Sequence, residues 1–259
     1  MNASGAQEWK KLAIGFASHA GFLAVLLAAW EWAARMGLLD PTFFGNPAGI
    51  ISFLWANFIQ GTQLWIELGW SVMSTLIAFI SGSLAAVLTG LVFVIFPRLE
   101  RFLDPYFSAL NALPRIALAP LFILWFGLGI GSKIAMGFTL TFFIVLSSTV
   151  AGMRGINQDH IVLTDTLGAT PRQKFFLVTL PGAVPVIFSG LRLGLIYALL
   201  GVIAGEILAA EHGLGQQLAY LASTFNMNGV MALLVVLAWL GMAATSGMTR
   251  LERHLLRWQ

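Results

Sequence analysis

The sequence predicts an all-α membrane protein with six transmembrane helices. Apolar residues make up 58% of the 259 residues and charged residues only 10%, which is too little polar surface for a soluble domain of this size. The apolar residues also form long stretches almost free of Lys, Arg, Asp and Glu, and a transmembrane helix needs roughly 20 such residues. We expect residues 1–259 to form a single transmembrane domain.

Six apolar stretches are the candidate spans. They cover residues 12–34, 69–96, 116–132, 134–153, 184–206 and 229–249. The first follows two lysines, as a signal peptide would, but its uncharged run from Leu12 to Trp30 exceeds the apolar region of a signal peptide. We therefore interpret it as a retained helix. The third stretch is short, and the fifth contains Arg192.

The basic residues predict the topology. With the N-terminus inside, eleven of the 14 Lys and Arg residues face the cytoplasm: Lys10, Lys11, Arg98, Arg101, Arg115, Arg154, Arg172, Lys174, Arg250, Arg253 and Arg257. Arg35 and Lys133 lie outside, and Arg192 is intramembrane. This bias follows the positive-inside rule. We expect both termini, residues 1–11 and 250–259, in the cytoplasm.

Two segments on the predicted outer side interrupt the apolar pattern. Residues 35–68 form the longest segment without a span, and a surface helix over about 47–60 is plausible there. The run Gly127-Leu128-Gly129-Ile130-Gly131 lies at the end of the third stretch and lacks the surroundings of a nucleotide-binding loop. It predicts a bend at the outer face of the membrane.

Small residues recur at four-residue spacing in two of the predicted spans. The second span contains Ala78, Gly82, Ala86 and Gly90, and the fifth contains Gly190 and Gly194. This spacing puts small side chains on one side of a helix and lets another helix approach closely. Whether these stripes meet within one chain or across a dimer stays open.

The sequence contains no combination of residues typical of an enzyme. It lacks Cys and any phosphate-binding G-x-x-x-x-G-K-[ST] loop, and its four His are scattered. We therefore expect no catalytic residues, no metal and no cofactor in this chain. The net charge of +3 is spread between the apolar runs, which favours lipid headgroups over nucleic acid as partners.

Two charged residues fall within or at the end of the fifth span. Ionisable groups inside a membrane are costly, so Arg192 and Glu206 are candidates for the solute pathway. The alternative is a polar contact within the bundle or at the membrane interface.

A polar, basic loop covers residues 154–181 and predicts two short helices. Leu163 and Leu167, four residues apart, give the first helix an apolar face suited to a groove on a partner. Gly168 can end this helix, and Thr170-Pro171 can start the next. A helix that lies on the bilayer surface is the alternative.

The landmarks of this loop resemble those of the EAA loop in binding-protein-dependent ABC importer permeases. Gly168 is followed after nine residues by Val178-Thr179-Leu180-Pro181, although Val162-Leu163-Thr164 stand where the family has Glu-Ala-Ala. Further matches are Gly190-Leu191-Arg192, Ala204-Gly205-Glu206 and Gly213-Leu214-Gly215. The stretch from Leu113 to Gly129 is similar to permeases of the nitrate, sulfonate and taurine group.

The resemblance implies a transport subunit of the bacterial inner membrane. It implies that the loop couples to two cytoplasmic ATP-binding subunits holding ATP-Mg, through Leu163, Thr164, Leu167, Gly168, Ala169, Arg172 and Pro181. A second permease copy, making a homodimer, and a periplasmic or lipid-anchored solute-binding protein are the other implied partners. The implied solute is an oxyanion or sulfonate such as nitrate, taurine or an alkanesulfonate. The alternative solute is a vitamin precursor or an aromatic nutrient. The alternative class of protein is an ion-coupled secondary transporter.

Overall fold

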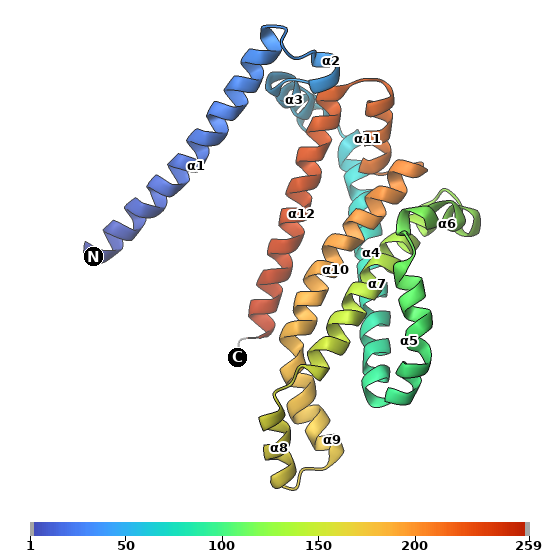
Figure 1. Ribbon diagram of the computed structural model, residues 1–259. Helices are drawn as coiled ribbons and strands as arrows, with labels where there is room; N and C mark the ends of the chain where they lie inside the picture. Colours follow the sequence, from blue (N-terminus) through green and yellow to red (C-terminus); the bar gives the residue numbers. More distant parts are fainter. Residues whose placement is uncertain (1–2, 257–259) are drawn as a thin grey trace. The chain divides into compact units, whose positions relative to one another are not determined.

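A computed structural model describes residues 3–256, with side chains described from residue 15 onward except residue 16. The described part is helical and contains no strand. The long helices are α1 (Ala3–Arg35), α4 (Gln63–Ile95), α5 (Pro97–Ala112), α7 (Ile130–Arg154), α10 (Leu180–Leu208) and α12 (Met227–Leu255). The shorter ones are α2 (Pro41–Phe44), α3 (Pro47–Leu54), α6 (Ala119–Phe126), α8 (Gln158–Thr166), α9 (Pro171–Lys174) and α11 (Leu214–Ser223) (Figure 1).

The chain divides into two compact units. The first holds the residues up to Gln63 together with Tyr220–Val235, and the second holds Leu64–Ala219 and the residues from Val236 onward. Both α11 and α12 therefore begin in one unit and end in the other. The single domain expected from the sequence stays a prediction. The ends of the chain expected in the cytoplasm include residues 1–2 and 257–259, which lie outside the described residues.

In the first unit, polar caps start the short helices. Asp40 accepts a hydrogen bond from the Thr42 N–H at 2.9 Å and caps α2, and Asn46 accepts one from the Gly49 N–H at 3.1 Å and caps α3. These caps supply partners to amide groups that have none within a helix. A π-helical turn, Trp55–Gln60, continues α3, so a helix is present over the residues 47–60. The Asn46 N–H also donates to Asn228 at the start of α12, at 2.8 Å.

In the second unit, α7 packs closely against both α4 and α10. A Cβ atom on Gly201 of α10 would lie 2.8 Å from the Cα of Gly137 on α7, so the two backbones touch. On the α4 side, a Cβ on Gly82 would lie 3.0 Å from the Cβ of Thr141. Close approach of this kind needs small residues, because larger side chains would push the helices apart.

Both predicted stripes of small residues lie against α7. Ala78, Gly82, Ala86 and Gly90 on α4 are buried, as are Gly190 and Gly194 on α10. Gly90 faces Thr149, and Gly194 faces Val145. In this chain the stripes therefore contact a helix of the same chain, which the sequence had left open.

The third predicted span, residues 116–132, is wrong as a single helix. A 3-10 turn, Arg115–Leu118, precedes α6, and α6 stops at Gly127, whose φ of +76° does not continue a helix. Leu113 before Pro114 is extended, because the proline ring disfavours helical backbone at the preceding residue. The chain bends by 90° between α5 and the segment that contains α6.

Four described helices are long and apolar enough to cross a membrane, or up to five if the bent pair is one span. They are α4, α7, the continuous helix Pro171–Leu208 that ends with α10, and α12. The first predicted span, residues 12–34, lies within α1, which is not one of these four. The structure is thus an all-helical, multi-span bundle, and the total of six spans stays a prediction.

Candidate functional site

Local residues start and end α8, the first helix of the predicted coupling loop. Asn157 caps it by accepting a hydrogen bond from the Asp159 N–H at 3.0 Å. At the other end Gly168 has a φ of +74°, which glycine adopts at little cost. The Ala169 N–H donates to the Thr164 carbonyl at 3.0 Å and closes the helix end. The loop is therefore a defined helix and turn.

The predicted contact residues of this loop differ in exposure. Leu163 and Leu167 are exposed by 56% and 76%, and the Leu167 N–H donates to the Leu163 carbonyl one turn away. Thr164 turns its hydroxyl to the carbonyls of His160 and Ile161, at 2.9 and 2.8 Å. The Thr164 hydroxyl therefore makes its hydrogen bonds within α8, while the two leucine side chains are exposed one turn apart.

The remaining predicted contact residues lie where α9 leads into α10. Lys174 forms an ion pair with Asp165 that ties α9 to α8. Arg172 is exposed, and its guanidinium carbon lies 6.0 Å from the centre of the Phe176 ring. Pro181 is partly buried in the first turn of α10. The loop is attached to the bundle through the start of α10.

Arg192 on α10 forms an ion pair with Glu252 on α12. The two side chains are only partly exposed, at 33% and 17%. The structure gives Arg192 a carboxylate partner within the bundle, near the middle of α10 and slightly closer to the end that adjoins the loop. A pair of this kind satisfies both charges in apolar surroundings.

Glu206 lies near the opposite end of α10 and is the centre of a buried polar cluster. Its carboxylate accepts hydrogen bonds from the Ser71 hydroxyl on α4 at 2.7 Å and from the Gly215 N–H at 2.9 Å. The Lys133 ammonium on α7 lies 3.8 Å away, and both charged side chains are buried. One carboxylate therefore links α4, α7 and the start of α11.

A second carboxylate completes this cluster. Glu67 on α4 is buried and accepts a hydrogen bond from the Gly213 N–H at 2.6 Å. The Ser71 hydroxyl accepts one from the Leu214 N–H at 2.8 Å, and Lys133 donates to the His212 carbonyl. The two carboxylates and a hydroxyl thus receive three successive amides at the start of α11, where a helix favours negative charge.

Sequence reasoning found only part of this cluster. It singled out Glu206 and the Gly213-Leu214-Gly215 motif separately, and the structure brings them together. It counted Lys133 only as a topology charge and missed Glu67 and Ser71. The one sequence signal for Glu67 and Ser71 was their four-residue spacing, which puts them on one side of α4. Their partners are more than 130 positions away along the chain.

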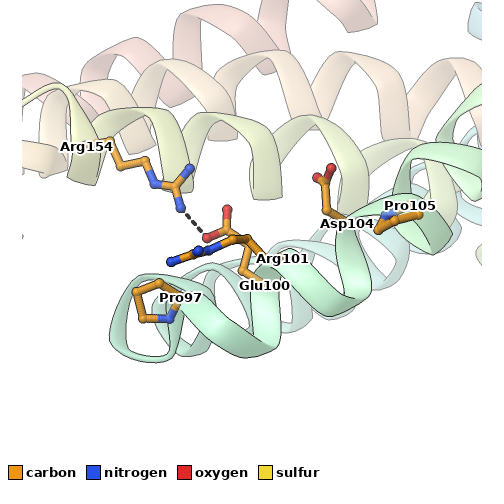
Figure 2. A pocket seen from close by; sticks show the side chains of 6 residues that line it. All are labelled: Pro97, Glu100, Arg101, Asp104, Pro105 and Arg154. Carbon is orange, nitrogen blue, oxygen red and sulfur yellow. Dashed lines mark hydrogen bonds and ion pairs between the residues drawn. The ribbon is translucent and has the colours of Figure 1, made fainter.

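A hollow of about 380 Å³ lies between α5 and α7. Glu100 on α5 forms an ion pair with Arg154 on α7, and Asp104 follows one turn along α5. These three residues also line a neighbouring pocket, which Figure 2 shows. Ser108 and Asn111 of α5 and Ser147 of α7 also line the hollow. Polar groups on two facing helices of a membrane protein are costly unless they face water or a solute. This hollow is therefore a candidate for the solute pathway.

Several apolar helices long enough to cross a membrane define a multi-pass membrane protein. Residues 78–257 match the family described as binding-protein-dependent transport system inner membrane component. The match covers well over half of the chain, so the chain belongs to this family of ABC transporter permeases.

Three relatives of similar length differ in their transported solutes. The formylaminopyrimidine transport permease ThiX of Halalkalibacterium halodurans is 34% identical, with 92% of this chain and 94% of the relative covered. The taurine permease TauC of Escherichia coli is 31% identical, with coverage of 92% and 88%. The riboflavin permease RibX of Chloroflexus aurantiacus is 30% identical, also with coverage of 92% and 88%.

The fold is also that of a solved permease. A chain of the MetNI methionine ABC transporter in an inward-facing conformation superposes with a TM-score of 0.59 over 74% of this chain and 94% of its own length. The sequence identity is 21%, so the likeness concerns the fold alone. Family membership makes the chain a multi-pass transport subunit of the inner membrane and implies ATP-binding and solute-binding partner proteins.

Proposed function

We propose that the chain forms the translocation path for a small oxyanion or sulfonate and is driven by two cytoplasmic subunits that bind ATP-Mg. The observation that carries this proposal is the exposed pair of Leu163 and Leu167 on α8. Two large apolar side chains on a short polar loop are best explained by burial in a partner's groove. The chain itself has no phosphate-binding loop, so hydrolysis takes place on that partner.

The helices after α8 can transmit a movement of the ATP-binding subunits to the membrane-spanning part of the chain. Asp165 at the end of α8 pairs with Lys174, and the helix Pro171–Leu208 then runs unbroken to the end of α10. When the ATP-binding subunits close, they displace α8, and α10 follows because a helix resists bending. The alternating access of the pathway follows from this displacement, with a second copy of the chain completing the path.

Two kinds of relatives support different solutes. TauC and the permeases for aliphatic sulfonates, which are 30% and 33% identical, favour a sulfonate or a similar oxyanion. ThiX and RibX favour a neutral or aromatic vitamin precursor, and Phe107 and Phe143 at the hollow between α5 and α7 are compatible with such a solute. We take the oxyanion as the first candidate and the vitamin precursor as the second. Family membership favours both over an ion-coupled transporter.

The coupling proposal is tested by placing charge on the apolar pair. In Leu163→Glu and Leu167→Glu we expect the ATP-binding subunits to co-purify at less than a tenth of the wild-type amount, and uptake to fall equally. A buried unpaired carboxylate in the groove is the physical reason. Gln158→Glu is the matched control, because it adds the same charge to an exposed position on the opposite side of α8. Wild-type association and uptake in both leucine variants would refute the proposal.

A further inference from the structure

The basic side chains of the described helices differ in their partners. Five of them pair with carboxylates: Arg35 with Glu31, Lys133 with Glu206, Lys174 with Asp165, Arg154 with Glu100 and Arg192 with Glu252. Arg98, Arg101, Arg172, Arg250 and Arg253 are exposed. Among the Lys and Arg side chains described, Arg115 is the one that is partly buried and has no carboxylate within ion-pair distance.

Arg115 lies at the break of the bent helix pair that begins with α5. Its guanidinium group donates to the side-chain oxygen of Asn111 at 2.9 Å and, through the same nitrogen, to the Asn111 carbonyl at 3.3 Å. The guanidinium carbon lies 4.4 Å from the centre of the Phe143 ring on α7. These contacts hold the side chain in place and use one of its three nitrogens. None of them neutralises its charge.

The position of Arg115 links it to the hollow between α5 and α7. Both of its partners, Asn111 and Phe143, line that hollow, and Ser108 and Ser147 line it further along. The carboxylates of the hollow, Glu100 and Asp104, lie about two or more helical turns before Asn111 on α5, and Glu100 is paired with Arg154. The volume of about 380 Å³ suits a small organic molecule. A fixed cation therefore stands beside a hollow lined by both polar and apolar side chains, within a helix pair apolar enough to count as one broken span.

We propose that Arg115 recognises the oxyanion group of the transported solute, which makes the solute an anion such as an alkanesulfonate. The guanidinium is planar, and its remaining N–H donors match the oxygens of a sulfonate or carboxylate in paired hydrogen bonds. Arg115 is partly buried, and a guanidinium partly withdrawn from water is stabilised by a counter-charge. A passing anion supplies that charge, and a neutral solute leaves the guanidinium without one.

The inference rests on the proposed transport function and adds the role of one residue and the charge of the solute. A purely structural role is the alternative, in which Arg115 only holds the break at Pro114 through the Asn111 carbonyl. The two roles differ in their chemistry. Recognition requires a positive charge at this point, whereas a structural clamp requires the hydrogen bonds to Asn111.

Because the chain contains no cysteine, Arg115→Cys creates a single thiol in it. The assembled importer carrying this variant is treated with an aminoethyl methanethiosulfonate, which adds a positive charge, or with a sulfonatoethyl analogue, which adds a negative one. Uptake of taurine, nitrate and a neutral formylaminopyrimidine is then measured. The treated wild-type importer is the control, because it reports any effect of the reagents on the partner subunits.

We expect Arg115→Cys to lower anion uptake at least tenfold, the aminoethyl reagent to restore it to within about threefold of wild type, and the sulfonatoethyl reagent to leave it low. Arg115→Lys should retain more anion uptake than Arg115→Gln. ATPase activity stimulated by the solute-binding protein should stay near wild type in all variants.

Two results overturn the inference and leave the transport function intact. One is anion uptake that is unchanged in Arg115→Cys and Arg115→Gln. The other is a wild-type importer that takes up the neutral solute and neither anion. Loss of uptake that neither reagent restores, with assembly lost as well, assigns Arg115 a structural role and also overturns it. An assembled wild-type importer that moves no solute and shows no coupled ATPase activity refutes the proposed function itself.

Discussion

The carboxylate of Glu206 and the ammonium of Lys133 lie 3.8 Å apart, with both side chains almost fully buried. The pair joins α10 to α7 at the end of the bundle opposite α8. Because Glu206 also accepts the Gly215 N–H and the Ser71 hydroxyl, the first turn of α11 is held against α4 and α10 within the second unit. The rigidity of this part of the structure therefore depends on the presence of both Glu206 and Lys133.

Removing one charge of this pair should cost more than removing both. Glu206→Gln removes the carboxylate that lies 3.8 Å from the buried Lys133 ammonium, and we expect a loss of about 3–5 kcal/mol in the free energy of unfolding. The double variant Lys133→Met, Glu206→Gln should be more stable than Glu206→Gln alone. Equilibrium unfolding in detergent micelles measures both. A double variant that loses the sum of the two single losses would contradict this account of the pair.

The contact between α7 and α10 should not tolerate an added methyl group. In Gly201→Ala the new Cβ would meet the Gly137 backbone at 2.8 Å, and overpacking of this kind costs about 1–3 kcal/mol. Gly69→Ala on α4 is the control, because its Cβ meets nothing within 4 Å. Alanine has the higher helix propensity, so that control should be neutral or slightly stabilising. Equal melting temperatures for the two variants would count against the tight contact.

The turn after α8 should depend on the backbone of Gly168. Its φ is +74°, and a Cβ there meets nothing within 4 Å, so any cost of substitution is conformational. Gly168→Val should reduce uptake severalfold, while Gly168→Asn, which tolerates this backbone region, should retain most of it. The global unfolding free energy should change by only about 1–2 kcal/mol. Uptake in Gly168→Val equal to that in Gly168→Asn would show that the positive φ is not needed.

The ion pair of Arg192 and Glu252 should behave as a structural contact between α10 and α12. Arg192→Glu places two carboxylates together, and we expect a loss of about 1–3 kcal/mol in the free energy of unfolding. Exchanging both residues, Arg192→Glu with Glu252→Arg, should recover most of that loss. Thermal unfolding of the three variants in detergent measures this. A double variant no more stable than Arg192→Glu would show that the pair alone does not explain the effect, and that the arginine is needed at position 192 itself.

Features set by neighbouring residues could be predicted from the sequence. The end of α8 at Gly168 and the start of α9 at Thr170-Pro171 are present, and Thr170 and Gln173 form reciprocal capping hydrogen bonds. Helix ends of this kind depend on side chains within about four residues. The third predicted span, residues 116–132, failed because hydropathy does not register a backbone break such as the positive φ of Gly127.

Partners of charged residues could not be predicted in the same way. Arg192 and Glu252 are 60 positions apart, and Glu67 and Gly213 are 146 positions apart. Periodicity places Arg192, Glu252 and Glu67 each on one side of its own helix. Which helix faces that side depends on the packing of the whole unit.

The sequence by itself determined the class of protein, the long apolar helices and the polar loop that contains Leu163 and Leu167. Hydropathy and helix caps are local properties of the chain, so these features follow from residues near one another. Only the tertiary structure decided that Glu206 is neutralised by Lys133 while Arg115 has no carboxylate beside it among the side chains that the structure describes. A charge buried in a membrane protein is satisfied by residues that packing brings together, and packing joins distant parts of the chain.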